Sequence, residues 1–445
     1  MCADTQSISQ LPFIITLSGR NNLISLLTGL SYERLNWLHR ASARTCVLTA
    51  WAHLGAMLGV GFAPSRTSTT GGLALAALSL LFLSSFGLFR RLAYEGFIAL
   101  HILLGIVLLA ALCVHRPMYR AWAWGGFVIW GFDRIISLGK MGWASRAGKT
   151  GKTGKTGAVV EVLGADVVKV TVTTGMKWNP GQHMFLTLPS IALQQHPFTM
   201  ASLASAASDA SPASPASDAS AASDTNAARE GGEAVFFIRA HKGFTRHLLS
   251  HPGPQRCLID GPYGIPPALT HYASVTLLAG GTGISFCLAL LLGLVRDARR
   301  SDSAVGLVHL VWNTRDEDAV AWIKGMIEME MGGSAGRMEV RVDVHRTRRG
   351  VETATPSVVS DKDEQGENDA LVSVINVLEG RADVEGTIRR NIASTPNDAG
   401  GMAVVVCGPS SLNLETRRAV CAVNTPSAVA KGQPPIHFYS EQFGW

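Results

Sequence analysis

The chain has 445 residues, enough for two or three domains, and its net charge is +6. Hydrophobic residues make up 47% and mean hydropathy is +0.21, with most of the apolar sequence in the first third. Basic residues flank the apolar segments and form no separate patch, which argues against a nucleic-acid-binding protein and fits the positive-inside rule. The seven cysteines form no CxxC motif, so neither a zinc ribbon nor a dithiol redox site is predicted.

The first third is predicted to be a membrane domain. Residues 1–34 are expected to form an incomplete helix and a cytosolic loop, because the apolar stretch LPFIITLSG is too short to span a bilayer. No basic segment leads into an apolar core here, so no signal peptide is predicted. The membrane domain is assigned to 35–140, and its four full spans are 35–60, 73–89, 96–114 and 121–138. Arginines at the start of the first span place that end in the cytosol.

Four histidines give this domain its predicted chemistry. His39 and His53 are 14 residues apart in the first span, and His101 and His115 have the same interval in the third. Fourteen residues is nearly four helical turns, so each pair shares one helix face, roughly 21 Å apart along the axis. Such helices side by side suit two stacked haems, each with two axial imidazoles. The alternative, packed core histidines, is disfavoured because ionisable groups are costly at membrane depth. The topology pairs His39 with His101 and His53 with His115.

The rest of the chain is predicted to be cytosolic. Residues 141–157 read as a basic linker, whose GKTGKTGKTG run lacks P-loop spacing. Residues 158–268 alternate at period two between turns, which predicts an antiparallel barrel with a low-complexity insertion at 201–231. Residues 269–445 alternate strand and helix, which predicts a doubly wound, mostly parallel sheet with a polar insertion at 346–370.

Gly-rich and basic turns follow several of these strands. The motif AGGTGIS joins the first strand of the parallel sheet to its helix, where backbone N–H groups suit a nucleotide pyrophosphate, although it is not GxGxxG. A CGP motif ends a late strand at the same edge, and its Cys407 is equally consistent with a buried small hydrophobe. Arg315, after the second strand, could pair with a 2′-phosphate and select NADPH. Arg116 could attract an anionic ligand, but a helix-end anchor is the favoured interpretation.

Together with the histidine helices, the motif HPFT, the stretch RAHKGFTR and a terminal Phe-Gly-Trp resemble the ferric reductase and NADPH oxidase family, in particular its fungal ferric-chelate reductases. The resemblance covers about residues 20 to 445. It implies a multi-pass α-helical membrane domain with bis-His haems, an antiparallel β-barrel FAD domain and an α/β NADP-binding domain like that of ferredoxin-NADP reductase. The family has six core membrane helices, and the two that are not found here carry no haem ligands.

The resemblance also assigns site residues. The flavin contacts that it implies are His196, Pro197, Phe198, Thr199, Arg239, Gly243, Phe244 and Thr245. The NADPH contacts that it implies are Gly280, Gly281, Thr282, Gly283, Ile284, Ser285, Arg315, Cys407, Gly408 and Pro409. Trp445 would cover the flavin until nicotinamide displaces it, and Cys407 would lie beside the nicotinamide. No further catalytic residue is expected beyond the cofactors.

The implied function is transmembrane reduction of extracellular ferric chelates, and of copper as a further substrate, by NADPH through FAD and two b-type haems. Two alternatives remain: a superoxide-generating NADPH oxidase, and an inactive or incomplete family fragment. The implied location is the plasma membrane, with the FAD and NADP domains in the cytosol. The expected partners are the lipid bilayer, NADPH, ferric chelates and a downstream iron permease and oxidase system, and no nucleic acid.

Overall fold

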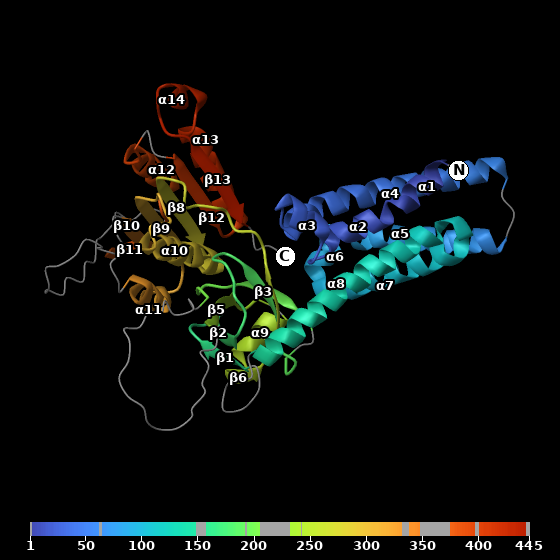
Figure 1. Ribbon diagram of the computed structural model, residues 1–445, viewed down its shortest axis with the longest axis horizontal. Helices are drawn as coiled ribbons and strands as arrows, with labels where there is room; N and C mark the ends of the chain where they lie inside the picture. Colours follow the sequence, from blue (N-terminus) through green and yellow to red (C-terminus); the bar gives the residue numbers. More distant parts are fainter. Residues whose placement is uncertain are drawn as a thin grey trace, which may run out of the picture. The chain divides into compact units, whose positions relative to one another are not determined.

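A computed structural model describes residues 2–61, 65–147, 157–191, 194–204, 232–241, 243–331, 338–347, 374–396 and 400–441 (Figure 1). The chain divides into two compact units, which meet in the sequence near Gly142. Most of the insertion predicted at 201–231, most of that at 346–370, and Trp445 lie outside the described residues.

The first unit is helical. Its elements are α1 (Cys2–Ser9), α2 (Leu11–Ser18), α3 (Leu23–Thr28), α4 (Tyr32–Val60), α5 (Arg66–Ser84), α6 (Gly87–Leu92), α7 (Tyr94–His115), the 3-10 turn η1 (Pro117–Tyr119) and α8 (Arg120–Ala147). Helix α7 packs along α5, while α1 and α2 pack along α4 (Figure 1). Their shared apolar core contains Ile14, Val47, Leu78, Leu109 and Tyr119. The outward-facing Leu, Phe and Trp side chains are largely exposed, as expected for lipid-facing surfaces.

Residues 1–34, predicted to be an incomplete helix and a loop, contain three short helices and the start of α4. The stretch expected to be a loop contains α3, which begins where the Asn22 side chain accepts a hydrogen bond from the Ser25 N–H. The two short helices before it lie within the bundle core through Ile8, Leu11 and Leu17.

Three helices in the described part of the chain are long and apolar enough to cross a membrane: α5, α7 and a helix over 281–299 in the second unit. The last has 72% of its most apolar window buried, so it is a core helix of a folded domain. Helices α4 and α8, predicted as the first and fourth spans, are 29 and 28 residues long but do not meet this criterion. Charged residues inside their length, such as Arg40, Arg44 and Asp133, lower their hydropathy.

The second unit begins with the predicted antiparallel β domain. Its strands are β1 (Gly157–Val162), β2 (Val167–Thr174), β3 (His183–Thr187), β4 (His196–Thr199), β5 (Gly232–Arg239), β6 (Gly253–Arg256) and β7 (Leu258–Tyr263), with α9 (Phe244–Leu249) before β6. They form two sheets, in the orders β5-β2-β1-β6 and β4-β3-β7. Strand β1 pairs antiparallel with β2 through the predicted hairpin, for example Val160 with Val170. Side chains of both sheets, among them Phe236 and Leu186, enclose one core.

The parallel sheet has the predicted doubly wound architecture. Its strands are β8 (Ser274–Gly280), β9 (Leu307–Thr314), β10 (Glu339–Arg346), β11 (Val374–Glu379), β12 (Met402–Cys407) and β13 (Ile436–Glu441), in the order β11-β10-β9-β8-β12-β13 and all parallel. Its helices are α10 (Ile284–Arg299), α11 (Ala319–Met331), α12 (Val384–Ala393), α13 (Ser410–Val423) and α14 (Pro426–Ala430). Helices α10 and α11 cover one face, and α12 and α13 the other. The strand order reverses between β8 and β12, which is where such sheets bind ligands.

Candidate functional site

The four histidines lie on the two helices that their spacing predicted. His39 and His53 belong to α4, and His101 and His115 belong to α7. All four are half-buried. In the part of the chain that the structure describes, no three His, Cys, Asp or Glu side chains gather into one group that could hold a metal ion.

His39 and His101 face each other across the bundle. Their ring centroids are 6.5 Å apart, with the planes tilted by 55°. Two imidazoles that share one metal ion through nitrogen bonds of about 2.0–2.1 Å have ring centroids about 6–6.5 Å apart. The separation of the His39 and His101 rings matches this distance, so these two residues would hold a haem iron, which would supply one-electron transfer.

The second ring nitrogen of His39 is already occupied. Its Nδ1 lies 2.8 Å from the Ile14 carbonyl oxygen, so Nδ1–H donates to helix α2. That bond leaves Nε2 without the proton and available as a ligand, which is how metal-binding histidines are usually oriented. The role of Ile14 could not be predicted from the sequence, because every residue has a backbone carbonyl.

His115 is oriented in the same way by α5. Its Nδ1 donates to the Thr67 carbonyl oxygen at 2.9 Å, and the Thr70 hydroxyl lies 3.4 Å from the same nitrogen. The ring stacks on Tyr119, with centroids 6.1 Å apart and planes within 16°. A Cβ on Gly71 would lie only 2.7 Å from His115 Cε1, so the glycine allows the close approach of helix and ring. His53, its predicted partner, belongs to α4.

The candidate flavin residues gather at the edge of the β domain. Strand β4 is HPFT, and the His196 ring stacks on Phe244 at 4.3 Å with planes within 11°. Phe198 also lies against Phe244, at 6.2 Å. The Thr199 side chain is buried, yet its hydroxyl oxygen has no hydrogen-bond partner. Burying a hydroxyl group without a hydrogen bond lowers the stability of the fold. The Thr199 hydroxyl is therefore available to form a hydrogen bond with a ligand, such as a flavin ring.

Arg239, at the end of β5, contacts residues of both the β domain and the parallel-sheet domain, and lies near the AGGTGIS turn. Its Nη2 donates to Asp316 Oδ2 at 2.8 Å, and its Nε lies 3.7 Å from Asp166 Oδ2. The guanidinium also lies 4.0 Å from the position that a Cβ on Gly281 would take. Gly243, before α9, has φ of +56°, a conformation that favours glycine. Thr245 accepts a hydrogen bond from the His241 N–H through its hydroxyl, at 3.0 Å.

The two glycine turns predicted to bind nucleotide meet at the strand-order reversal. A Cβ on Gly280 would lie 2.7 Å from Pro409 Cδ, and one on Gly408 would lie 3.0 Å from Gly280 Cα. A Cβ on Gly283 would lie 2.2 Å from the Cys407 carbonyl oxygen. The turns at 280–283 and 407–409 are in backbone contact because their glycines have no side chains. Such a close backbone approach is typical of a turn that binds a pyrophosphate.

Neighbouring side chains complete this edge of the sheet. The Trp312 indole, fully buried within β9, donates from Nε1 to the Gly281 carbonyl oxygen at 2.9 Å. Ser285 lies in the first turn of α10, and its buried hydroxyl has no partner. Thr282 lies in the turn between β8 and α10, and Ile284 is buried at the start of that helix. Arg315 is exposed directly after β9, next to Asp316.

Matches to known families follow these three structural parts. The profile "Ferric reductase like transmembrane component" matches residues 5–112, "FAD-binding domain" matches 153–211, and "Ferric reductase NAD binding domain" matches 272–421. This chain belongs to the ferric reductase family. The first match begins at residue 5, so the family likeness includes α1 and α2, which the sequence analysis had placed outside it.

Curated relatives of this ferric reductase family member are fungal. A protein named "Probable cell surface ferric reductase kap2" from Aspergillus oryzae is 30% identical over 346 residues, covering 72% of this chain and 44% of that protein. "Ferric/cupric reductase transmembrane component 2" of Saccharomyces cerevisiae is 26% identical over 477 residues, covering 99% of this chain and 60% of that protein. The chain thus spans about half the length of the curated relatives that it matches.

Among solved structures, a Neisseria gonorrhoeae ferredoxin NADP+ reductase with bound FAD and NADP is 11% identical. The match covers 64% of this chain and 97% of that chain, with a TM-score of 0.41. A Malassezia yamatoensis flavohemoglobin is 14% identical, covers 98% of this chain and 95% of that chain, and has a TM-score of 0.42. The fold assignment therefore rests on the family matches and on the sheet topology.

Cys407 behaves as a buried core residue in this family member. It is fully buried at the end of β12, and burial, with the nearby Cys287 thiol and Glu441, holds the pKa of its thiol well above the usual range. Burial likewise raises the pKa of the Cys287 thiol. Thiolates are the reactive form, so neither group is a nucleophile at neutral pH.

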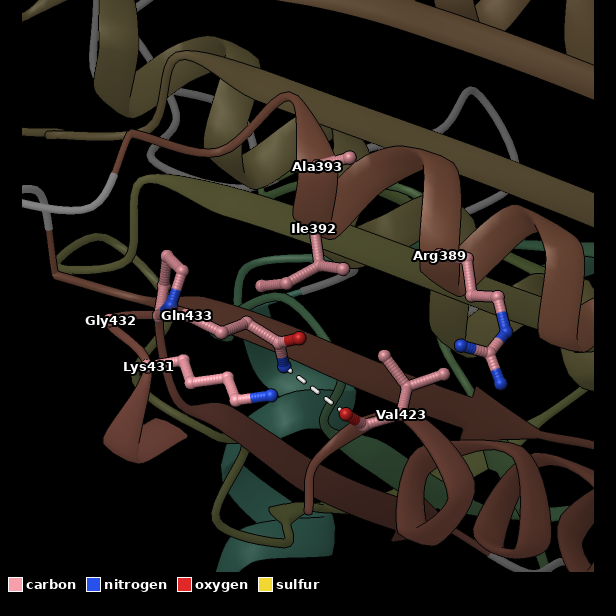
Figure 2. A pocket seen from close by; sticks show the side chains of 8 residues that line it. Arg389, Ile392, Ala393, Val423, Lys431, Gly432 and Gln433 are labelled. Carbon is pink, nitrogen blue, oxygen red and sulfur yellow. Dashed lines mark hydrogen bonds between the residues drawn. The ribbon is translucent and has the colours of Figure 1, made fainter. Parts of the chain in front are cut away.

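A cavity of about 330 Å³ lies away from all of these groups (Figure 2). It is lined by the ends of α12 and α13 and by the turn after α14, near the starts of β12 and β13. There the Gln433 amide donates to the Val423 carbonyl oxygen at 3.2 Å (Figure 2). No predicted site residue lines it, and ligands of such sheets bind at the opposite, carboxyl edge.

Proposed function

We propose that this chain is a transmembrane ferric-chelate reductase that carries electrons from NADPH, through FAD and two b-type haems, to ferric chelates on the other side of the membrane. Cupric ions are a second proposed acceptor. The observation that carries the proposal is the facing pair His39 and His101, 6.5 Å apart, with His39 Nδ1–H committed to a carbonyl of α2. The reductase names of the fungal relatives support it.

The helical unit would hold the two haems. His39 and His101 are proposed to ligate one, and His53 and His115 the other. Two imidazoles on each iron leave no open coordination position, so the site suits electron transfer rather than direct oxygen binding. The Ile14 and Thr67 carbonyls keep His39 and His115 in the tautomer that presents Nε2 to a metal.

The second unit would hold the flavin and the nucleotide. When bound, a flavin accepts a hydride from a nicotinamide and releases its electrons singly, which suits one-electron acceptors. The Thr199 hydroxyl and the HPFT backbone are proposed to line the flavin, with the Arg239 guanidinium near its pyrophosphate. The touching turns at Gly280, Gly283 and Gly408 would accept the nucleotide pyrophosphate, and the exposed Arg315 would pair with a 2′-phosphate.

The proposed orientation follows the positive-inside rule. Exposed arginines at positions 34, 40 and 44 mark the His39 end of α4, so this end is proposed to face the cytosol together with the flavin and nucleotide domains. The His53 and His115 end would face outward. The cell-surface description of the Aspergillus oryzae relative supports a plasma membrane location, where an iron permease system could take up the product.

The decisive test is a reduced-minus-oxidised spectrum of the purified full chain, with haem and flavin quantified per chain. The proposal expects two low-spin b-type haems, of which His39→Ala and His101→Ala each remove the same one. The exposed His251 lies outside both units' proposed sites, so His251→Gln is the matched control that keeps both haems. A flavoprotein without haem would refute the electron path.

The competing oxidase function makes a different prediction. Superoxide production that matches NADPH consumption in the absence of any ferric chelate would identify an oxidase and reject the reductase. Arg315→Ala should raise KM for NADPH but not for NADH, since only NADPH carries the 2′-phosphate. An equal rise for both nucleotides would reject the proposed role of Arg315.

A further inference from the structure

Three arginines lie at the helix ends next to His115 or next to residues that contact it. Arg66 begins α5, Arg116 follows α7, and Arg120 begins α8. All three are exposed. We call this set, Arg66, Arg116 and Arg120, the arginine rim.

Chain neighbours and hydrogen bonds link the rim to the His115 ring. Arg66 directly precedes Thr67, whose carbonyl oxygen accepts the His115 Nδ1–H bond at 2.9 Å. Arg116 is covalently next to His115. Arg120 donates from Nε to the Cys113 carbonyl oxygen at 3.0 Å, which keeps its stem at the last turn of α7. The three side chains therefore start from positions fixed around one imidazole.

The helix ends that carry the rim contain no acidic residue, because the sequence has no Asp or Glu from 34 to 94 or from 96 to 132. Helix α1, which packs along α4, carries Asp4. The positive-inside rule places excess arginine at the cytosolic end, which here already holds those at 34, 40 and 44. The positive-inside rule therefore does not explain a cationic group at the opposite end, where helix-end anchoring is the alternative to ligand binding.

We propose that the arginine rim is the docking surface for a negatively charged ferric chelate, with carboxylate ligands around the iron, next to the outer haem site. This inference rests on the proposed function, since it concerns the acceptor of the same electron path. Guanidinium groups pair with carboxylates in a bidentate manner, and several like charges around one site raise the local concentration of anions. The positive charge of the rim would attract an anionic chelate to the site next to His115, and it would not increase the affinity for a cationic acceptor.

The experiment compares two one-electron acceptors of opposite charge, the anionic ferric-EDTA complex and the cationic hexaammineruthenium(III) complex. The full chain is reconstituted in nanodiscs with saturating NADPH. Exposed charge pairs are each worth a few-fold in affinity, so R66Q/R116Q/R120Q should raise KM for ferric-EDTA about tenfold. KM for the ruthenium complex should stay unchanged or fall. The ferric-EDTA KM of the wild-type chain should rise with salt, because salt screens exposed charges.

Two further variants separate charge from fold. R66K/R116K/R120K keeps the charge and should stay within about threefold of wild-type KM for ferric-EDTA. R66Q/R116Q leaves the Arg120 contact with α7 intact and should show an intermediate KM, with an unchanged haem spectrum. The inference is overturned if the triple Gln variant keeps the wild-type KM for ferric-EDTA, or if both acceptors weaken equally. A wild-type chain that reduces neither acceptor would instead reject the proposed function.

Discussion

Among single alanine substitutions at the glycines of the AGGTGIS turn, Gly283→Ala should be the most disruptive. The new Cβ would lie 2.2 Å from the Cys407 carbonyl oxygen and 2.7 Å from its carbonyl carbon, whereas real Cβ contacts are almost never shorter than 3.0 Å. The turn and β12 would have to separate by about 0.8 Å. Cys407 is paired in register with Ala279 of β8, so its backbone cannot simply move aside.

The expected cost follows from comparable substitutions. Overpacking a well-packed interior typically costs about 1–3 kcal/mol. For a domain of this size that corresponds to a decrease in Tm of roughly 2–10 °C. If the turn opens only when nucleotide binds, the same energy appears as a roughly 5–150-fold weaker Kd, at about 1.4 kcal/mol per tenfold.

The assay measures thermal unfolding and NADPH binding of the full chain in detergent. Gly325→Ala is the matched control, because a Cβ at that exposed position on α11 meets nothing within 4 Å. Alanine also has the higher helix propensity, so this variant should be stabilised by about 0.5–1 kcal/mol. A Gly283→Ala variant with wild-type Tm and wild-type NADPH affinity would refute the account of the turn.

Three further predictions follow from contacts elsewhere in the chain. Gly71→Ala should displace the His115 ring and lower outer-haem content, whereas Gly72→Ala, whose Cβ meets nothing within 4 Å, should not, as a haem-per-chain measurement would show. Burial of His345 lowers the pKa of its imidazole, so the folded protein resists protonation. Stability to urea should therefore fall as pH drops below about 6.5, the unfolded pKa, and His345→Gln should reduce that slope. The exposed Cys421 should be alkylated well before the buried thiols behind the nucleotide turn, as peptide mass spectrometry can follow.

The histidine helices were predictable because helical periodicity is a property of spacing alone. Fourteen residues return to the same face, so His39 and His53, and likewise His101 and His115, had to share a helix side. The groups that orient those rings were not predictable. The Ile14 carbonyl belongs to a helix too short to be recognised as part of the bundle, and main-chain acceptors are the same at every residue.

The class of the parallel sheet was predicted correctly, but one of its strands and one of its helices were missed. Strand β11 and helix α12 were missed because they follow a long polar insertion, and VINVLE is a short apolar run that periodicity alone cannot assign. Helix α10 shows the opposite problem. It is as apolar as α5, one of the helices long and apolar enough to span a membrane. The two helices differ in burial, because α10 lies between the parallel sheet and the β domain.

Gly280 and Gly408, one from each glycine motif of the nucleotide domain, are 128 residues apart in the sequence but lie in contact in the fold. Each needs glycine because the other occupies the space where a side chain would go: Gly280 faces Pro409, and Gly408 faces the Gly280 backbone. This mutual exclusion follows from β8 and β12 being neighbours at the point where the strand order reverses. A substitution in either turn should therefore be read as a change in both, and a double variant at Gly280 and Gly408 should cost less than the sum of the single variants, since the first already separates the strands.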